Sequence, residues 1–212
     1  MKKPSKKDMI ALIDYWRSFV PRRPMTYGQN LHDGREQAYQ VRALADENTP
    51  AVDVQWLFEQ TAIPVLLVPS YVLGENSGLT MDKPGGELRI FINENEPYTR
   101  QRFSVLHELK HALDFYDHPV LYAKLGRDEQ NRSELIEAIA NDFAAHVLMP
   151  TELVKRAWFD MQDTALAASA FNVSYEAMQT RLEKLGLIGA PKFWRAVART
   201  PVNDPSYSAC AA

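Results

Sequence analysis

The sequence has few of the features that mark secreted or membrane proteins. Cys210 is its only cysteine, so no internal disulfide can form, which suits a reducing compartment. The most apolar run, AIPVLLVPSYVL, is interrupted by Pro64 and Pro69 and is too short to span a bilayer. Asp14 and Arg17 interrupt the apolar residues that follow the basic start, which is not the pattern of a signal peptide. We therefore expect a cytoplasmic protein that does not contact membranes.

The chain also lacks an excess of charge of either sign. It has 24 Lys and Arg residues against 27 Asp and Glu residues, a net charge of -3. This balance provides no general attraction to nucleic acid, so direct nucleic-acid binding is not expected. A single cysteine also excludes a Cys-rich zinc site, so any metal must be held by histidine and carboxylate side chains.

The 212 residues suffice for one catalytic domain with a full core. Apolar periodicity and turn residues predict two helices before any strand, then a buried strand and a hairpin with the turn KPGG. A helix, a polar loop expected to be mobile, a second long helix ended by Pro150 and three short helices follow. The expected ranges are 30–46, 50–61, 63–69, 77–95, 102–116, 116–132, 133–150, 151–158, 164–171 and 174–186. Together they predict an α+β fold with a small mixed or antiparallel sheet.

The segment RFSVLHELKHALDFY, residues 102–116, carries the pattern H-E-x-x-H at His107, Glu108 and His111. Because an α-helix turns about 100° per residue, the two histidines lie one turn apart on one face and can bind a single ion. A catalytic zinc normally has three protein ligands and leaves a fourth position for water. The motif therefore requires a third ligand from elsewhere in the chain.

Two candidates for the third ligand follow the motif closely. Asp117 lies six residues after His111, but the class that uses this position needs a glycine where this chain has Asp114. His118 would lie about 10 Å further along the same helix, too far to share an ion. Both positions therefore fit poorly.

Two further candidates lie on the next long helix. Glu137 is 26 residues after His111, as in zinc peptidases whose third ligand is a glutamate on a following helix. Asn141, one turn later on the same face, can hydrogen-bond a ligand histidine and fix its ring. His146 is about half a turn out of phase with Glu137 and is not expected to reach the same metal. Glu137 is the best placed of the four.

Taken together, these motifs resemble those of the ImmA/IrrE family of metallopeptidases. The matching stretches are IFIN, RQRFSVLHELKH, EAIANDFAAHVLMP and FNVSYEAMQTRLEKLGLI. The resemblance covers roughly residues 28–188, with helix-turn-helix-like closing helices at about 164–188. It implies a zincin-like metallopeptidase domain there. Residues 1–27, basic and then proline-bearing, predict an extension with one short helix, and the prolines near the end predict an irregular tail over 189–212.

Carried over residue by residue, the resemblance implies one zinc ion per chain on His107, His111 and Glu137, with Glu108 as the general base. Lys110 and Ile139 depart from the family pattern, but neither is at a ligand position. The family often cleaves a helix-turn-helix repressor encoded nearby, in mobile-element, toxin-antitoxin or stress circuits. A zinc endopeptidase with such a protein substrate is therefore the expected function.

Two other functions are compatible with the sequence. LAASAFNVSYEAMQTRLEKLG has the form of a helix-turn-helix, but the charges of its second helix sum to about zero, whereas a DNA-binding helix needs a basic face. A peptidase-like scaffold that only binds a repressor or antitoxin is the other alternative.

The strand just before the metal helix is a candidate substrate-binding strand. In peptidases of this architecture such a strand often lies at a sheet edge, where its free backbone groups pair with an extended peptide. Ile90, Phe91 and Ile92 are the residues expected to do this.

Overall fold

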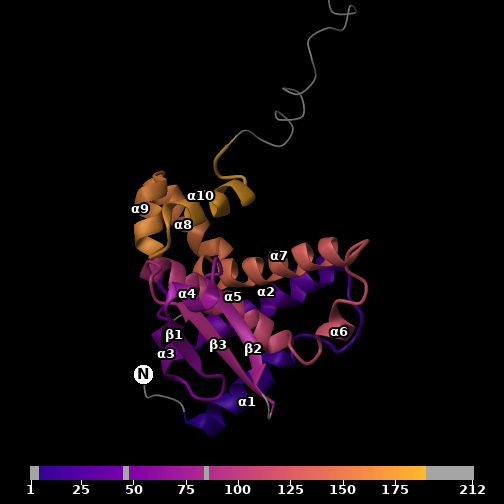
Figure 1. Ribbon diagram of the computed structural model, residues 1–212. Helices are drawn as coiled ribbons and strands as arrows, with labels where there is room; N and C mark the ends of the chain where they lie inside the picture. The colour runs from indigo at the N-terminus through magenta and orange to yellow at the C-terminus, as the bar shows by residue number, and fades with distance from the viewer. Residues whose placement is uncertain (1–4, 45–47, 84–85, 190–212) are drawn as a thin grey trace, which may run out of the picture.

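A computed structural model describes residues 5–44, 48–83 and 86–189 of the chain (Figure 1). The expected tail therefore lies almost wholly outside the described residues, as do Pro84 and Gly85 of the expected hairpin turn. The described part contains helices and one small sheet, in agreement with the α+β prediction. None of its helices is long and apolar enough to cross a membrane.

The sheet has three strands, β1 (Val65–Val68), β2 (Gly78–Lys83) and β3 (Glu87–Asn93), in the order β1-β3-β2. β1 runs parallel to β3, with Val65 opposite Ile90, and β2 runs antiparallel to it, with Gly78 opposite Ile92. The predicted hairpin is therefore present. Because β3 lies between the other two strands, both of its edges are already paired.

Helix α5 (Tyr98–Asp114) packs on one face of this sheet, as Figure 1 shows. Ile90 and Ile92 on β3 meet Val105, Leu106 and Leu109 of α5 in the main core. On its other side α5 contacts α7 (Glu129–Leu148), which also packs along α2 (Tyr27–Ala43). The helix that carries the H-E-x-x-H motif is therefore held between the sheet and a long helix.

Helix α1 (Lys6–Arg17) is the predicted short helix of the N-terminal segment, and it begins with a capping box at Ser5 and Asp8. Its residues Met9, Ile13 and Trp16 are part of the main core. The first helix therefore contributes to the same core as the metal helix.

Residues 116–132 are more ordered than a loop. They include the short helix α6 (His118–Leu121) and the first turn of α7, which Asp128 caps. Leu121 and Leu125 are buried in a second apolar cluster with Ile136 of α7. The apolar residues of this charged stretch thus pack it against α7.

Two further short helices, α3 (Gln55–Glu59) and α4 (Ser70–Leu73), flank β1.

Helices α8 (Thr151–Met161), α9 (Thr164–Phe171) and α10 (Tyr175–Lys184) gather beyond the end of α7 (Figure 1). Asn172 adopts a left-handed conformation at the end of α9, and Ser174 caps α10. The guanidinium of Arg102, on α5, donates hydrogen bonds to the carbonyl groups of Phe171 and Asn172. The second arginine of the RQRFS run therefore ties the turn between α9 and α10 to the metal helix.

Candidate metal centre

Three side chains from α5 and α7 converge on one point. His107 Nε2 lies 3.0 Å from His111 Nε2 and 3.1 Å from Glu137 Oε2, and His111 Nε2 lies 3.4 Å from Glu137 Oε1. These are the three residues that can bind one metal ion together within the described part of the chain. Ligand atoms about 2.0–2.1 Å from a tetrahedral zinc lie about 3.3 Å from one another, so the spacing and the donor types fit zinc.

The orientation of His107 is set by α7. Its Nδ1 lies 3.0 Å from Asn141 Oδ1, so Nδ1–H donates to the amide oxygen and Nε2 is left to face Glu137. Asn141 follows Glu137 by one helical turn, so the same face of α7 presents both side chains. Asn141 therefore lies beside His107, as expected for a residue one turn after Glu137 on the same helix face.

The charges of the three groups depend on one another. Hydrogen bonds from His107 and His111 hold the pKa of Glu137 far below its usual value, although partial burial acts in the opposite direction. Burial opposes the charging of His111, but its hydrogen bond with Glu137 and the negative charge of Glu108 outweigh burial and raise the pKa of His111. A dication at this point would take the place of these protons.

Glu108 points from α5 toward strand β2. Thr80 Oγ1 lies 2.8 Å from Glu108 Oε2 and donates to it, which fixes the carboxylate at the wall of the cleft. A Cβ atom on Gly78 would come within 2.8 Å of Glu108 Cγ, so β2 can approach this side chain only with glycine at that position. Neither residue can be recognised from the sequence as part of the site, because the role of each depends on how β2 packs against α5.

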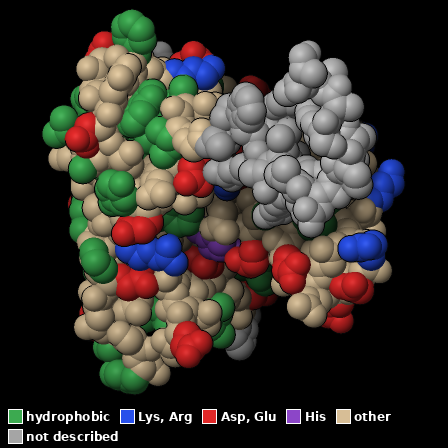
Figure 2. Space-filling view, turned by 90° about the horizontal axis from the view of Figure 1, so that it is seen from above, with side chains coloured by type: hydrophobic (Ala, Val, Ile, Leu, Met, Phe, Trp, Pro, Cys, Tyr) green, Lys and Arg blue, Asp and Glu red, His purple; other side chains and the backbone are tan. Residues whose placement is uncertain are grey.

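The metal-site residues line a cleft of about 790 Å³. Its walls are β2 with residues 75–77, the exposed face of α5, the start of α6, and Glu137 and Asn141 of α7. Figure 2 shows histidine side chains at the base of a hollow, with carboxylates around it. The site is therefore open to a ligand as large as a peptide.

The other candidates for the third ligand do not join the three-residue cluster. Asp117 forms an ion pair with Arg22 at 2.6 Å. His146 Nδ1 donates to the carbonyl oxygen of Asp142 at 2.7 Å. His118 lines the cleft, with its ring 4.9 Å from that of Tyr122. Among the described residues, none of these three joins the metal-site cluster.

The substrate-binding role expected for Ile90, Phe91 and Ile92 is wrong. β3 is the central strand, and its backbone groups pair with β1 on one side and β2 on the other. A peptide cannot add to a strand whose two edges are both paired. Ile90 and Ile92 instead point into the core against α5.

Comparison with known proteins assigns the family. Residues 67–183 match a peptidase family described as the IrrE N-terminal-like domain, and this range includes α5, α7 and all of α10 except its last residue. The chain belongs to this family. It is therefore related to metallopeptidases, and the three side chains at the candidate centre agree with the metal ion that such a family requires. The search of curated proteins found no match.

The IrrE-like fold also has relatives among solved structures. A Mycobacterium tuberculosis transcriptional regulator matches with a TM-score of 0.50 and 16% sequence identity. The match covers 80% of this chain and 51% of the regulator, so this chain spans about half the length of that structure. At this level of identity the likeness concerns the fold.

Two residues that depart from the ImmA/IrrE pattern lie away from the cleft. Lys110 is buried, and its Nζ donates to Asp114 Oδ1 at 2.9 Å and to Gln37 Oε1 at 3.0 Å. Ile139 is buried in the second apolar cluster beside α6. Neither substitution changes a group that faces the metal-site residues.

Proposed function

We propose that this chain is a zinc-dependent endopeptidase that cleaves a protein substrate. The observation that supports this most directly is the spacing of His107, His111 and Glu137, whose ligand atoms approach one another at the distances of a tetrahedral zinc site. Three protein ligands leave a position for a reacting group, as in catalytic rather than structural zinc sites.

The roles of the chain's own residues follow from their positions. When bound, zinc supplies Lewis-acid activation of water and of the scissile carbonyl. Glu108, held by Thr80, accepts the proton of the attacking water and returns it to the amine that leaves when the C–N bond breaks. Asn141 keeps His107 in the tautomer that presents Nε2 to the metal.

A direct test separates metal binding from hydrolysis. The Glu108→Gln variant keeps the three ligands and the shape of the side chain but removes the base, so we expect about one zinc per chain and a loss of cleavage of at least about 100-fold. Metal content by mass spectrometry and hydrolysis of a quenched peptide library measure the two properties. A fully active Glu108→Gln variant, or a wild-type protein that takes up no zinc, would refute the mechanism.

The free edge beside the site belongs to β2. Asn93 N–H donates to the Ser77 carbonyl at 3.0 Å, so in the alternating antiparallel ladder Leu79 also bonds to β3, while the backbone groups of Gly78 and Thr80 face outward. We propose that an extended substrate segment pairs with β2 there. N-methylation of one peptide residue near the cleaved bond should then slow cleavage about 10-fold. If every N-methylated peptide is cleaved as fast as the unmethylated peptide, this pairing is excluded.

The substrate we propose is a helix-turn-helix repressor encoded near this gene, in line with the ImmA/IrrE resemblance. A cut in a loosened segment between its DNA-binding and dimerisation parts would end repression. Co-expression of both proteins and mass spectrometry of the fragments tests this. If the two form a stable complex and the repressor stays intact under every condition, the chain acts as a binding scaffold instead.

A further inference from the structure

A second cavity, of about 330 Å³, adjoins the cleft between α5, α7 and α10. Arg100, Phe103 and Asn141 line both spaces. Asn141 also bonds His107, so the mouth of the cavity lies next to a metal-site residue. A peptide with its reacting carbonyl at the metal centre would therefore have a neighbouring side chain at this mouth.

Apolar side chains line two facing walls of this cavity, together with polar groups and the charged side chains of α10, Glu176, Arg181 and Lys184. Phe103 of α5 and Ala145 and Leu148 of α7 form one side, and Val173 and Ala177, just before and within α10, form the other. The volume exceeds that of any single side chain in a protein core, and small residues such as the two alanines leave it open. The apolar walls therefore suit a large apolar group.

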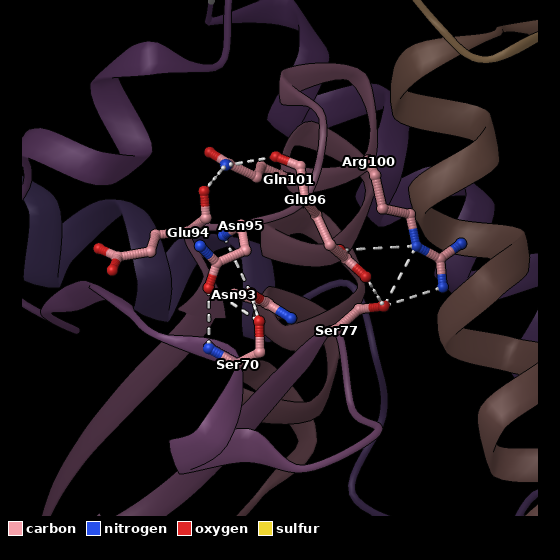
Figure 3. Close-up of polar contacts among 8 residues, drawn as sticks. All are labelled: Ser70, Ser77, Asn93, Glu94, Asn95, Glu96, Arg100 and Gln101. Atoms are coloured by element: carbon pink, nitrogen blue, oxygen red, sulfur yellow. Dashed lines mark hydrogen bonds and ion pairs between the residues drawn. The ribbon is translucent and has the colours of Figure 1, made fainter.

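Arg100, which lines both spaces, belongs to a polar cluster with Ser77 and Glu96 (Figure 3). Arg100 donates from Nε and Nη2 to Ser77 Oγ, at 3.2 and 3.1 Å, and Ser77 Oγ–H donates to Glu96 Oε1 at 2.7 Å. The guanidinium lies 5.9 Å from the centre of the Phe103 ring. Residues just before β2 and the start of α5 are thus linked beside a residue that lines both spaces.

We propose that this cavity is the subsite for a large apolar side chain of the substrate, next to the bond that is cut. The proposal rests on the proposed peptidase function, and it gives α10 a role as a wall of the specificity pocket. Arg181 of α10 agrees with this role, because it is buried and donates to the Met149 carbonyl at 2.9 Å and to Thr151 Oγ1 at 3.1 Å. It is therefore not available for phosphate contacts.

The test uses binding to the zinc-loaded full chain, so it does not depend on turnover. Two series of peptide hydroxamates carry either a leucine-type or an alanine-type side chain, placed on either side of the chelating group. Each buried methylene contributes about fourfold in affinity. We therefore expect the leucine-type probe of one series to bind about 10- to 50-fold more tightly than its alanine-type partner.

Two variants reduce the space. Ala177→Phe adds a ring at a half-buried lining position, and Thr180→Trp adds one at an exposed lining position, with less risk to folding. Each should reduce the preference for the leucine-type probe to below about threefold, while the alanine-type probe keeps its affinity. Glu183→Phe is the matched control, since Glu183 is exposed on α10 and does not line the cavity. It should keep the wild-type preference.

The outcomes distinguish the subsite from the peptidase activity. A probe preference that Thr180→Trp removes and Glu183→Phe keeps supports the subsite, even if no peptide is hydrolysed and the peptidase proposal fails. No preference in the wild-type protein, or a preference that survives both filling variants, overturns the subsite while leaving peptidase activity possible. A zinc-loaded protein that binds no hydroxamate overturns both proposals.

Discussion

The contact between Asn141 and His107 leads to a quantitative prediction about metal affinity. In the Asn141→Ala variant, His107 Nδ1–H loses the amide oxygen that lies 3.0 Å away. The ring can then rotate and can adopt the tautomer that protonates Nε2, which cannot bind metal. Metal binding should weaken although all three ligands remain.

The size of the effect follows from the surroundings of the bond. Loss of a hydrogen bond to a ligand histidine typically costs about 10- to 100-fold in metal affinity. Asn141 is exposed, so water can replace its oxygen, and we expect the lower end of that range. A 10-fold loss corresponds to about 1.4 kcal/mol. Asn141→Asp, which keeps an acceptor at the same place, should bind zinc at least as tightly as the wild type.

Competition with a chromophoric zinc chelator measures these affinities on the full chain, and circular dichroism of the metal-free proteins checks that the variants fold. Zinc binding by Asn141→Ala as tight as that of the wild type would refute this role of Asn141. Zinc binding by Asn141→Asp as weak as that of Asn141→Ala would also refute it, because the hydrogen-bond acceptor would then not be the property that matters.

Two further predictions concern α7 and its surroundings. Glu137→Ala should lower zinc affinity by at least about 100-fold in the same competition assay, whereas Asp117→Ala should leave it nearly unchanged. A large loss of affinity in Asp117→Ala and none in Glu137→Ala would instead identify Asp117 as the third ligand. Asp142→Asn should lower the free energy of unfolding by roughly 1 kcal/mol at pH 7, a value reduced for solvent screening. Burial raises the pKa of Asp142, but hydrogen bonds from His146 and Arg35 outweigh it and lower that pKa to about 2, below the usual 3.8. This stabilisation is present above about pH 4 and is lost as the pH falls toward 2, so urea unfolding curves of variant and wild type should converge there; a constant difference would refute the assignment.

The parts of the site that could be predicted depend on helical geometry. The spacing of His107 and His111 on one helix, and of Glu137 and Asn141 on another, follows from 3.6 residues per turn and is readable from the sequence. Which two helices meet is not readable from helical spacing. Their pairing is predicted from the position of Glu137 on a following helix, as in other zinc peptidases, and from the family resemblance. The structure then brings the two faces together through the packing of α5 against α7.

The parts that could not be predicted depend on contacts between distant segments. The order of the strands places β3 in the centre, although nothing in the sequence near Phe91 distinguishes a central strand from an edge strand. Thr80 and Gly78 become site residues only because β2 packs against α5. In the segment 116–132, the few apolar residues that pack α6 against the second apolar cluster are too widely spaced among charged residues to show a helical pattern in the sequence.

Lys110 shows how a charge beside the candidate metal ligands can be accommodated. A buried ammonium is costly unless its charge is neutralised and its donors are used. Asp114, one turn later on α5, provides the opposite charge, and Gln37 of α2 accepts a second hydrogen bond. The other carboxylate oxygen of Asp114 accepts a hydrogen bond from Tyr122, just after α6. The lysine therefore belongs to a network that joins α5, α2 and the segment after α6. Because the start of α6 is one wall of the cleft, this network links that wall to α5, the helix that carries His107 and His111.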